Sequence, residues 1–162
     1  MKSVRYIKMP WSKQLLVSTI ISSIVIVSSA FISLCCYCFC DLDARTRTTL
    51  VLLMVVLNVS FVVAAMMAPK RIEIGDESLD VCLFGGRIRI RKDEIKKVTK
   101  FSPQSSTLRV VGIGGLFGYI GLFRNKELGL FYSYVTDFNK SYIVYREKKY
   151  PIVISADSAL FL

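Results

Sequence analysis

The chain has 162 residues, of which 53% are hydrophobic, and a formal net charge of +10. It contains no histidine, which excludes Ser-His and Cys-His nucleophile pairs and every metal site that needs an imidazole ligand. The positive charge suits anionic lipid headgroups, and the sequence has no zinc-finger, basic-heptad or RNP motif for nucleic acid. We therefore expect no nucleic-acid partner, no metal, no cofactor and no enzymatic activity.

Residues 1–14 form a basic segment that precedes a long apolar run. Trp11 marks a membrane interface, because tryptophan is enriched at the level of the headgroups. The apolar run exceeds the usual length of a signal-peptide core, about 7 to 15 residues, and Leu34 stands where cleavage before Cys35 would need a small residue. We expect an uncleaved anchor.

Residues 15–39 and 50–68 are apolar segments joined by a polar loop over residues 41–49. Each segment is uncharged and long enough, at about 1.5 Å of rise per residue, to cross a hydrocarbon core of roughly 30 Å. The short loop makes the two helices antiparallel neighbours, so residues 15–68 form a transmembrane hairpin. The excess of Lys and Arg outside the loop predicts a multi-pass protein of the cell (inner) membrane with both termini in the cytoplasm.

Four of the five cysteines lie close together between Cys35 and Cys40, at the end of the first apolar segment. Their helical spacing leaves metal binding, redox pairing and lipidation open. A free cysteine also behaves as a small hydrophobe, and packing in the last turns of a membrane helix is the interpretation that we favour. We therefore expect this cluster to be dispensable.

After Pro69 the apolar residues alternate with polar ones, which predicts β-strands. The Gly85-Gly86 pair predicts a two-residue type I′ turn, because glycine accepts positive φ at both central positions. Residues 98–101, 108–111, 130–135, 142–145 and 152–154 are expected to be further strands. Many short strands predict an all-β, mainly antiparallel sandwich or barrel over residues 69–162. The predicted hairpin pairs Leu83 with Ile88 and Val81 with Ile90 on a buried face, and Cys82 with Arg89 and Asp80 with Arg91 on the other.

Residues 112–123 are rich in glycine and aromatic residues but match no phosphate-binding loop, since the third glycine of a G-x-G-x-x-G motif would fall on Phe117. The stretch either dips into the headgroup region of the membrane or folds back as part of the core. We favour the core, because a large exposed apolar patch is rare unless it is used. The residues of the alternative membrane-interface loop are Leu116, Phe117, Tyr119 and Ile120.

Six short motifs follow one another between residues 69 and 160: Pro69-Lys70-Arg71-Ile72, Asp93-Glu94-Ile95-Lys96-Lys97-Val98, Gly114-Gly115-Leu116-Phe117-Gly118-Tyr119, Leu128-Gly129, Val135-Thr136-Asp137 and Tyr150-Pro151-Ile152-Val153-Ile154-Ser155. Together they resemble the bacterial pleckstrin-homology-like (PH-like) domain family, whose members are often tethered to two membrane helices. The resemblance implies a seven-stranded, strongly bent sandwich closed by a C-terminal helix. That helix would be short or truncated, because the chain ends where it should be under way, and Ala156 replaces the usual proline. The family has no established catalytic residues, so none is assigned.

One face of the predicted hairpin is strongly basic, because alternating side chains project to the same side of a strand. Candidate residues for binding a ligand or a membrane surface are Arg87, Arg89, Arg91, Lys96, Lys97 and Lys100. We expect a membrane-anchored binding module at the cytoplasmic face, which contacts lipid headgroups, a protein partner or another copy of the chain. The alternatives are a structural or accessory subunit of a larger membrane complex and, for the basic face, a solvated surface that serves solubility.

Overall fold

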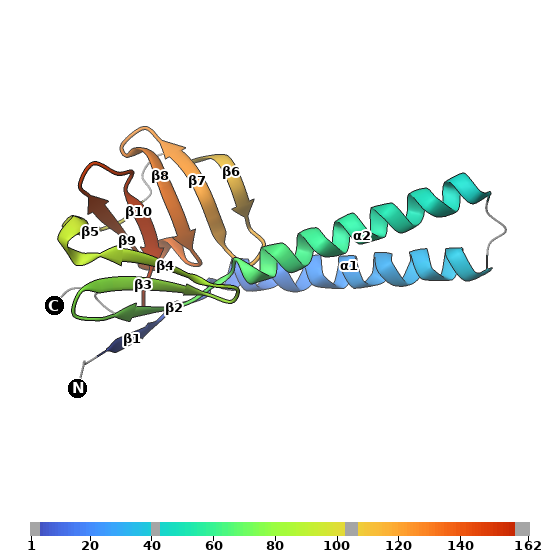
Figure 1. Cartoon of the computed structure of the whole chain (residues 1–162), viewed down its shortest axis with the longest axis horizontal. Helices are drawn as coiled ribbons and strands as arrows, with labels where there is room; N and C mark the ends of the chain where they lie inside the picture. Colours follow the sequence, from blue (N-terminus) through green and yellow to red (C-terminus); the bar gives the residue numbers. More distant parts are fainter. Residues whose placement is uncertain (1–3, 40–42, 103–106, 158–162) are drawn as a thin grey trace.

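Two helices leave one end of a β domain and run side by side (Figure 1). The computed structural model describes residues 4–39, 43–102 and 107–157, and the helices are α1 (Lys13–Phe39) and α2 (Ala44–Met66). Both helices are long and apolar enough to cross a membrane, and most of their apolar side chains are exposed. Exposed apolar surface of this extent is rare in water and suits a bilayer.

The helix α2 begins at Ala44, earlier than the expected residue 50. Asp43 is the reason, because its carboxylate accepts hydrogen bonds from the Thr46 amide at 3.2 Å and from the Thr46 hydroxyl at 2.5 Å, which caps the helix. The polar first turn therefore extends the helix beyond the apolar segment, and Arg45 and Arg47 belong to α2.

Within the described residues, ten strands form two sheets. The smaller sheet has the order β1-β2-β3-β4, with β1 (Arg5–Lys8), β2 (Pro69–Ile74), β3 (Ser78–Leu83) and β4 (Arg87–Arg91). The larger sheet has the order β5-β9-β10-β8-β7-β6, with β5 (Ile95–Lys100), β6 (Leu108–Gly114), β7 (Tyr119–Asn125), β8 (Gly129–Val135), β9 (Ser141–Arg146) and β10 (Ile152–Ser155). All pairs are antiparallel except β8 and β10.

This architecture confirms the mainly antiparallel all-β sandwich that follows two apolar helices. In the part of the chain that the structure describes, the sheets do not close into a barrel. Nine strands follow the hairpin in the described residues, rather than the seven that the family resemblance implied. One strand that the sequence pattern did not predict is β7, which begins inside the glycine-rich residues 112–123. The expected C-terminal helix falls on residues 158–162 and lies outside the described residues.

The apolar core has two parts, one on each side of the larger sheet. Ile152 and Ile154 of β10 face the smaller sheet, where they join Ile72, Leu79 and other aliphatic side chains. Val153 faces the opposite side and joins an aromatic cluster built around Phe101, Phe123 and Phe131. Burial on both faces explains why β10 reads as a continuous apolar run instead of an alternating one.

The N-terminal segment is not a free basic tail, because its strand β1 pairs with β2, the strand that follows the two helices in the chain. Ile7 and Met9 are buried in the core of the domain, and Lys8 between them is exposed. This alternation of buried apolar and exposed basic residues is typical of a strand, although the basic composition of residues 1–14 made it less evident. The helical hairpin α1–α2 is therefore a long connection between two neighbouring strands of one sheet.

The register of the β3–β4 hairpin differs from the expected one by two residues. Val81 lies opposite Ile88, and Cys82 lies opposite Arg87. The Leu83 amide donates to the Gly86 carbonyl at 2.8 Å, so the turn is centred on Phe84 and Gly85, and neither Gly85 nor Gly86 has the positive φ of a type I′ turn. A shift by two residues preserves the face of every side chain, so the expected division into two faces holds although the expected partners were wrong.

Candidate binding site

The helical hairpin is hydrogen-bonded to the β domain at both of its bases. At the start of α1, the Thr136 hydroxyl donates to the Pro10 carbonyl at 2.6 Å, and the Ser12 amide donates to the Thr136 carbonyl at 3.2 Å. At the end of α2, the Gly85 amide donates to the Met66 carbonyl at 2.7 Å. These bonds fix the β3–β4 turn beside the last turn of α2.

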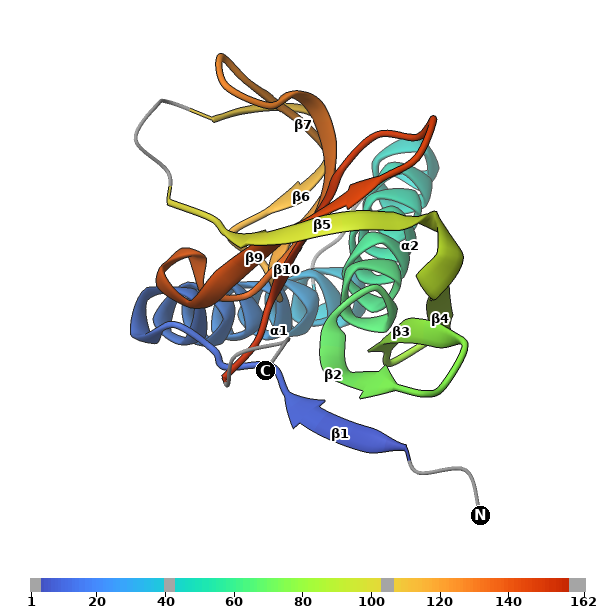
Figure 2. The same ribbon diagram turned by 90° about the vertical axis from the view of Figure 1, so that its left-hand side faces the viewer.

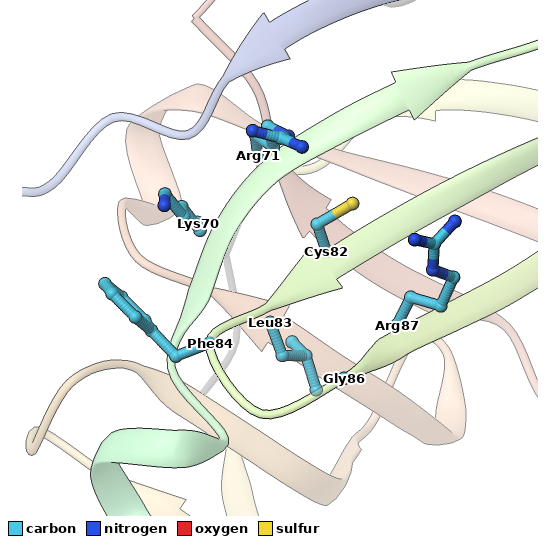
Figure 3. Close-up of a pocket in the computed structure, with 7 residues that line it drawn as sticks. All are labelled: Lys70, Arg71, Cys82, Leu83, Phe84, Gly86 and Arg87. Atoms are coloured by element: carbon cyan, nitrogen blue, oxygen red, sulfur yellow. The ribbon is translucent and has the colours of Figure 1, made fainter.

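A basic pocket lies next to this turn (Figure 3). It has a volume of about 310 Å³, within the range of small ligand sites. Its lining residues are Lys70 and Arg71 of β2, Cys82 and Leu83 of β3, Phe84 and Gly86 of the turn, and Arg87 of β4.

The pairing of three strands explains why the cations of the pocket meet. Arg71 pairs with Cys82, and Cys82 pairs with Arg87, so the two guanidinium groups project from the same face on either side of a small residue. The β-bulge between Pro69 and Arg71 adds Lys70 to the rim. A row of three side chains thus places positive charge on the strands next to the turn that contacts the end of α2.

Each cation of the pocket has a different environment. The Nη2 atom of Arg71 lies 2.7 Å from Oε1 of Glu73, and this guanidinium holds the pKa of Glu73 below its usual value. The ammonium group of Lys70 lies 5.3 Å from the centre of the Phe84 ring. Arg87 has no hydrogen bond or ion pair to any described residue, which leaves its donors available. The three cations outnumber the one neighbouring carboxylate.

Cys82 forms the floor between the two arginines. Burial raises the pKa of its thiol, and the nearby Glu73 carboxylate raises it further. The thiol is therefore protonated at neutral pH, and only the thiolate is a strong nucleophile. This chemistry suits a neutral lining residue and does not suit covalent catalysis.

The six candidate basic residues do not form one patch. Three of them are neutralised locally: Arg89 by Asp80 with an Nε to Oδ1 distance of 3.3 Å, Arg91 by Asp93, and Lys96 by Glu147 with an Nζ to Oε1 distance of 3.5 Å. The strand β4 runs away from the helices, so its arginines lie at increasing distances from them, and β5 with Lys97 and Lys100 lies at the far end of the domain (Figures 1 and 2). Only Arg87 belongs to the pocket.

Lys70 and Arg71 were missing from the sequence-derived site. Their position directly after the second apolar segment was the available signal, because cations at this point lie beside the headgroups of a membrane that the segment crosses.

The glycine-rich stretch is the hairpin of β6 and β7. Gly112 faces Gly121 across the pair, and a Cβ on Gly112 would lie 2.1 Å from the Ile120 carbonyl oxygen, so only glycine permits this approach. Of the residues proposed for a membrane-interface loop, Ile120 is fully buried and Tyr119 packs on Phe138, with ring centres 4.7 Å apart.

The tip of the β6–β7 hairpin carries the other two residues, Leu116 and Phe117, which are partly buried. The Phe117 ring lies 5.2 Å from the Phe61 ring of α2, and the Phe117 amide donates to the Thr19 hydroxyl of α1 at 3.2 Å. The tip therefore rests against both helices.

The cysteine cluster lies at the opposite end of the hairpin from the pocket. Cys35, Cys36 and Cys38 belong to the last turns of α1, and Cys40 lies outside the described residues. The packing role of this cluster and its dispensability stay predictions.

A comparison with protein families gives a match of residues 70–159 to the family described as bacterial PH domain. Comparisons with curated proteins and with solved structures give no match. The matched region covers more than half of the chain and contains the pocket and both sheets except β1. It confirms the resemblance that the six sequence motifs indicated. The chain therefore belongs to the bacterial PH domain family.

Proposed function

We propose that this protein is a non-enzymatic binding module, anchored in the cell membrane by its helical hairpin with both termini in the cytoplasm. Its basic pocket binds the phosphate of an anionic lipid headgroup. The observation that carries this proposal is the convergence of Lys70, Arg71 and Arg87 beside the last turn of α2.

The position of the pocket supports a lipid as the ligand. Where α2 crosses a bilayer, its end at Met66 lies at the level of the headgroups, and the hydrogen bond from Gly85 to Met66 holds the pocket at the same level. Phe84, 64% exposed beside Lys70, supplies an aromatic side chain of the kind found at membrane interfaces.

The chemistry of the lining supports a phosphate. A guanidinium group binds phosphate oxygens through two parallel N–H donors, and the donors of Arg87 are available for this contact. Each cation near an anionic membrane contributes about 1 kcal/mol to binding, so three cations together favour the anionic lipid over a zwitterionic one. The protonated Cys82 thiol adds no reactive group, which agrees with binding rather than catalysis.

Native mass spectrometry of the full chain in detergent tests the proposal. The protein is incubated with phosphatidylglycerol or with phosphatidylcholine, and the retained lipid is counted. We expect retention of phosphatidylglycerol, and its loss in the double variant Lys70→Gln/Arg87→Gln. The double variant Lys97→Gln/Lys100→Gln removes the same charge from the far end of the domain and should retain the lipid.

Equal retention by the two double variants, or equal binding of both lipids by the unchanged protein, would exclude the pocket as a headgroup site. Retention of a protein instead of a lipid on purification in mild detergent would favour the accessory-subunit alternative.

A further inference from the structure

The outer edge of the larger sheet is apolar and exposed. The strand β6 is the last of its sheet, so it is paired on one side only. Leu108 and Val111 are 68% exposed, and Val110 is 49% exposed. The pairing of β6 with β7 shifts register between Arg109 and Val111, at the centre of this edge. Edge strands of soluble domains usually carry charges that prevent association, and an apolar edge therefore requires a cover.

The contact of the hairpin tip with the helices determines the level of β6. Thr19 lies six residues after the start of α1, about 9 Å at 1.5 Å per residue, and Phe61 lies five residues before the end of α2, about 8 Å. The polar layer of a bilayer is roughly 5 to 8 Å thick on each side of its hydrocarbon core. Measured from the bases of the helices, the tip reaches the boundary between headgroups and hydrocarbon.

From this tip the strand β6 runs obliquely to the helices and is the strand of the larger sheet nearest to them (Figure 1). The edge that carries these exposed side chains is therefore on the side of the larger sheet from which the helices extend. We propose that the edge Leu108, Val110 and Val111 lies in the interfacial layer of the bilayer and contacts lipid directly. This inference rests on the proposed membrane anchoring but not on the phosphate pocket.

The cations around the edge agree with a lipid surface as the occupant. Arg124 of β7 pairs with Leu108. The guanidinium of Arg109 extends along the strand toward the tip, since a Cβ on Gly114 would lie 3.2 Å from its Nη1 atom. An apolar row with arginines that reach the headgroup level is typical of interfacial segments, in which the long side chains keep their charge in the polar layer.

Site-directed fluorescence in the full chain tests this contact. The single tryptophan is first removed by Trp11→Phe, and Val110→Trp is then introduced on the edge. The protein is reconstituted into vesicles of phosphatidylcholine and phosphatidylglycerol, with and without brominated acyl chains that quench tryptophan on contact. Tyr150→Trp, in the β9–β10 loop at the far end of the domain, is the matched control, and Phe31→Trp reports insertion of α1.

We expect Val110→Trp to lose emission in brominated vesicles and to emit at shorter wavelength than Tyr150→Trp, which should be unaffected. Val111→Trp should give the same result if Val110→Trp fails to fold. Quenching in the Phe31→Trp variant without quenching on β6 would overturn the edge contact and leave the anchoring intact. Absence of quenching at all these positions would overturn both. A blue shift on β6 that depends on protein concentration and not on brominated lipid would identify a second copy as the cover and also overturn the proposal.

Discussion

The ring of Phe117 lies 5.2 Å from the ring of Phe61, so the tip of the β6–β7 hairpin packs on α2, which precedes the family domain in the chain. Phe117 has a φ of 58°, in the left-handed region that non-glycine residues rarely adopt. The amide of this residue donates to Thr19. A strained backbone of this kind persists only where surrounding contacts hold it, and here both helices supply those contacts.

We expect Phe61→Leu to weaken this docking by about 0.5 to 1.5 kcal/mol, the usual value of an aromatic pair beyond its buried area. Hydrogen exchange of a peptide that contains Phe117, measured by mass spectrometry in detergent, should become faster. Phe31→Leu changes an exposed aromatic residue of α1 and should leave the exchange unchanged. Unchanged exchange in both variants would show that the tip does not depend on α2.

Gly85 and Gly86 provide a test of the attachment of α2 to the domain. A Cβ on Gly85 would lie 2.9 Å from the Met66 Cβ, whereas a Cβ on Gly86 meets nothing within 4 Å. We expect Gly85→Ala to destabilise the protein by about 1 to 3 kcal/mol through overpacking, and Gly86→Ala to change it by less than about 1 kcal/mol. Denaturant titration of the detergent-solubilised protein measures both. Equal effects would contradict the contact between the turn and α2.

Ser155 is a buried junction between β8 and β10. Its hydroxyl oxygen accepts hydrogen bonds from the amides of Thr136 and Asp137, each at 3.0 Å. We expect Ser155→Ala to cost about 1 to 3 kcal/mol, because a buried donor without a partner loses its solvation without compensation. Ser102→Ala, at an exposed position, is the control in the same titration. A stability equal to that of the control would show that the two amides find other acceptors.

Glu73 should make the stability of the protein sensitive to acid. Its pKa is lowered in the folded state, chiefly by the hydrogen bond from Arg71, so its contribution is complete above the unfolded value of about 4.3 and is lost as the pH falls through the lower folded value. We expect Glu73→Gln to reduce the difference in melting temperature between pH 3 and pH 7. Glu77→Gln, on an exposed turn, should not. An identical pH dependence of the two variants would contradict the ion pair.

The topology of the hairpin can be tested with reporter fusions. The strands β1 and β10 both belong to the β domain, so the two described ends of the chain lie at the same end of the hairpin (Figure 1). We expect a C-terminal alkaline phosphatase fusion to be inactive and a C-terminal fluorescent protein to be bright, because the Lys and Arg bias predicts a cytoplasmic location for this end. An active phosphatase at this position would contradict the predicted orientation.

The sequence by itself determined the two apolar helices, most of the strands and the family. These features depend on composition and periodicity over short windows, since an uncharged segment of sufficient length suits a bilayer and alternation suits a half-buried strand. The division of the β3–β4 hairpin into two faces was also predictable, because an error of two residues in register leaves the faces unchanged.

The tertiary structure alone decided which cations meet and why Gly85 is a glycine. The sequence suggested a positive φ at Gly85, but its lack of a side chain serves the close approach to Met66. Likewise Arg71 and Arg87 meet only because both strands pair with β3 on either side of Cys82, whereas Arg89 and Arg91 find acidic partners. Such relationships depend on which segments become neighbours after folding, and local periodicity contains no information about that choice.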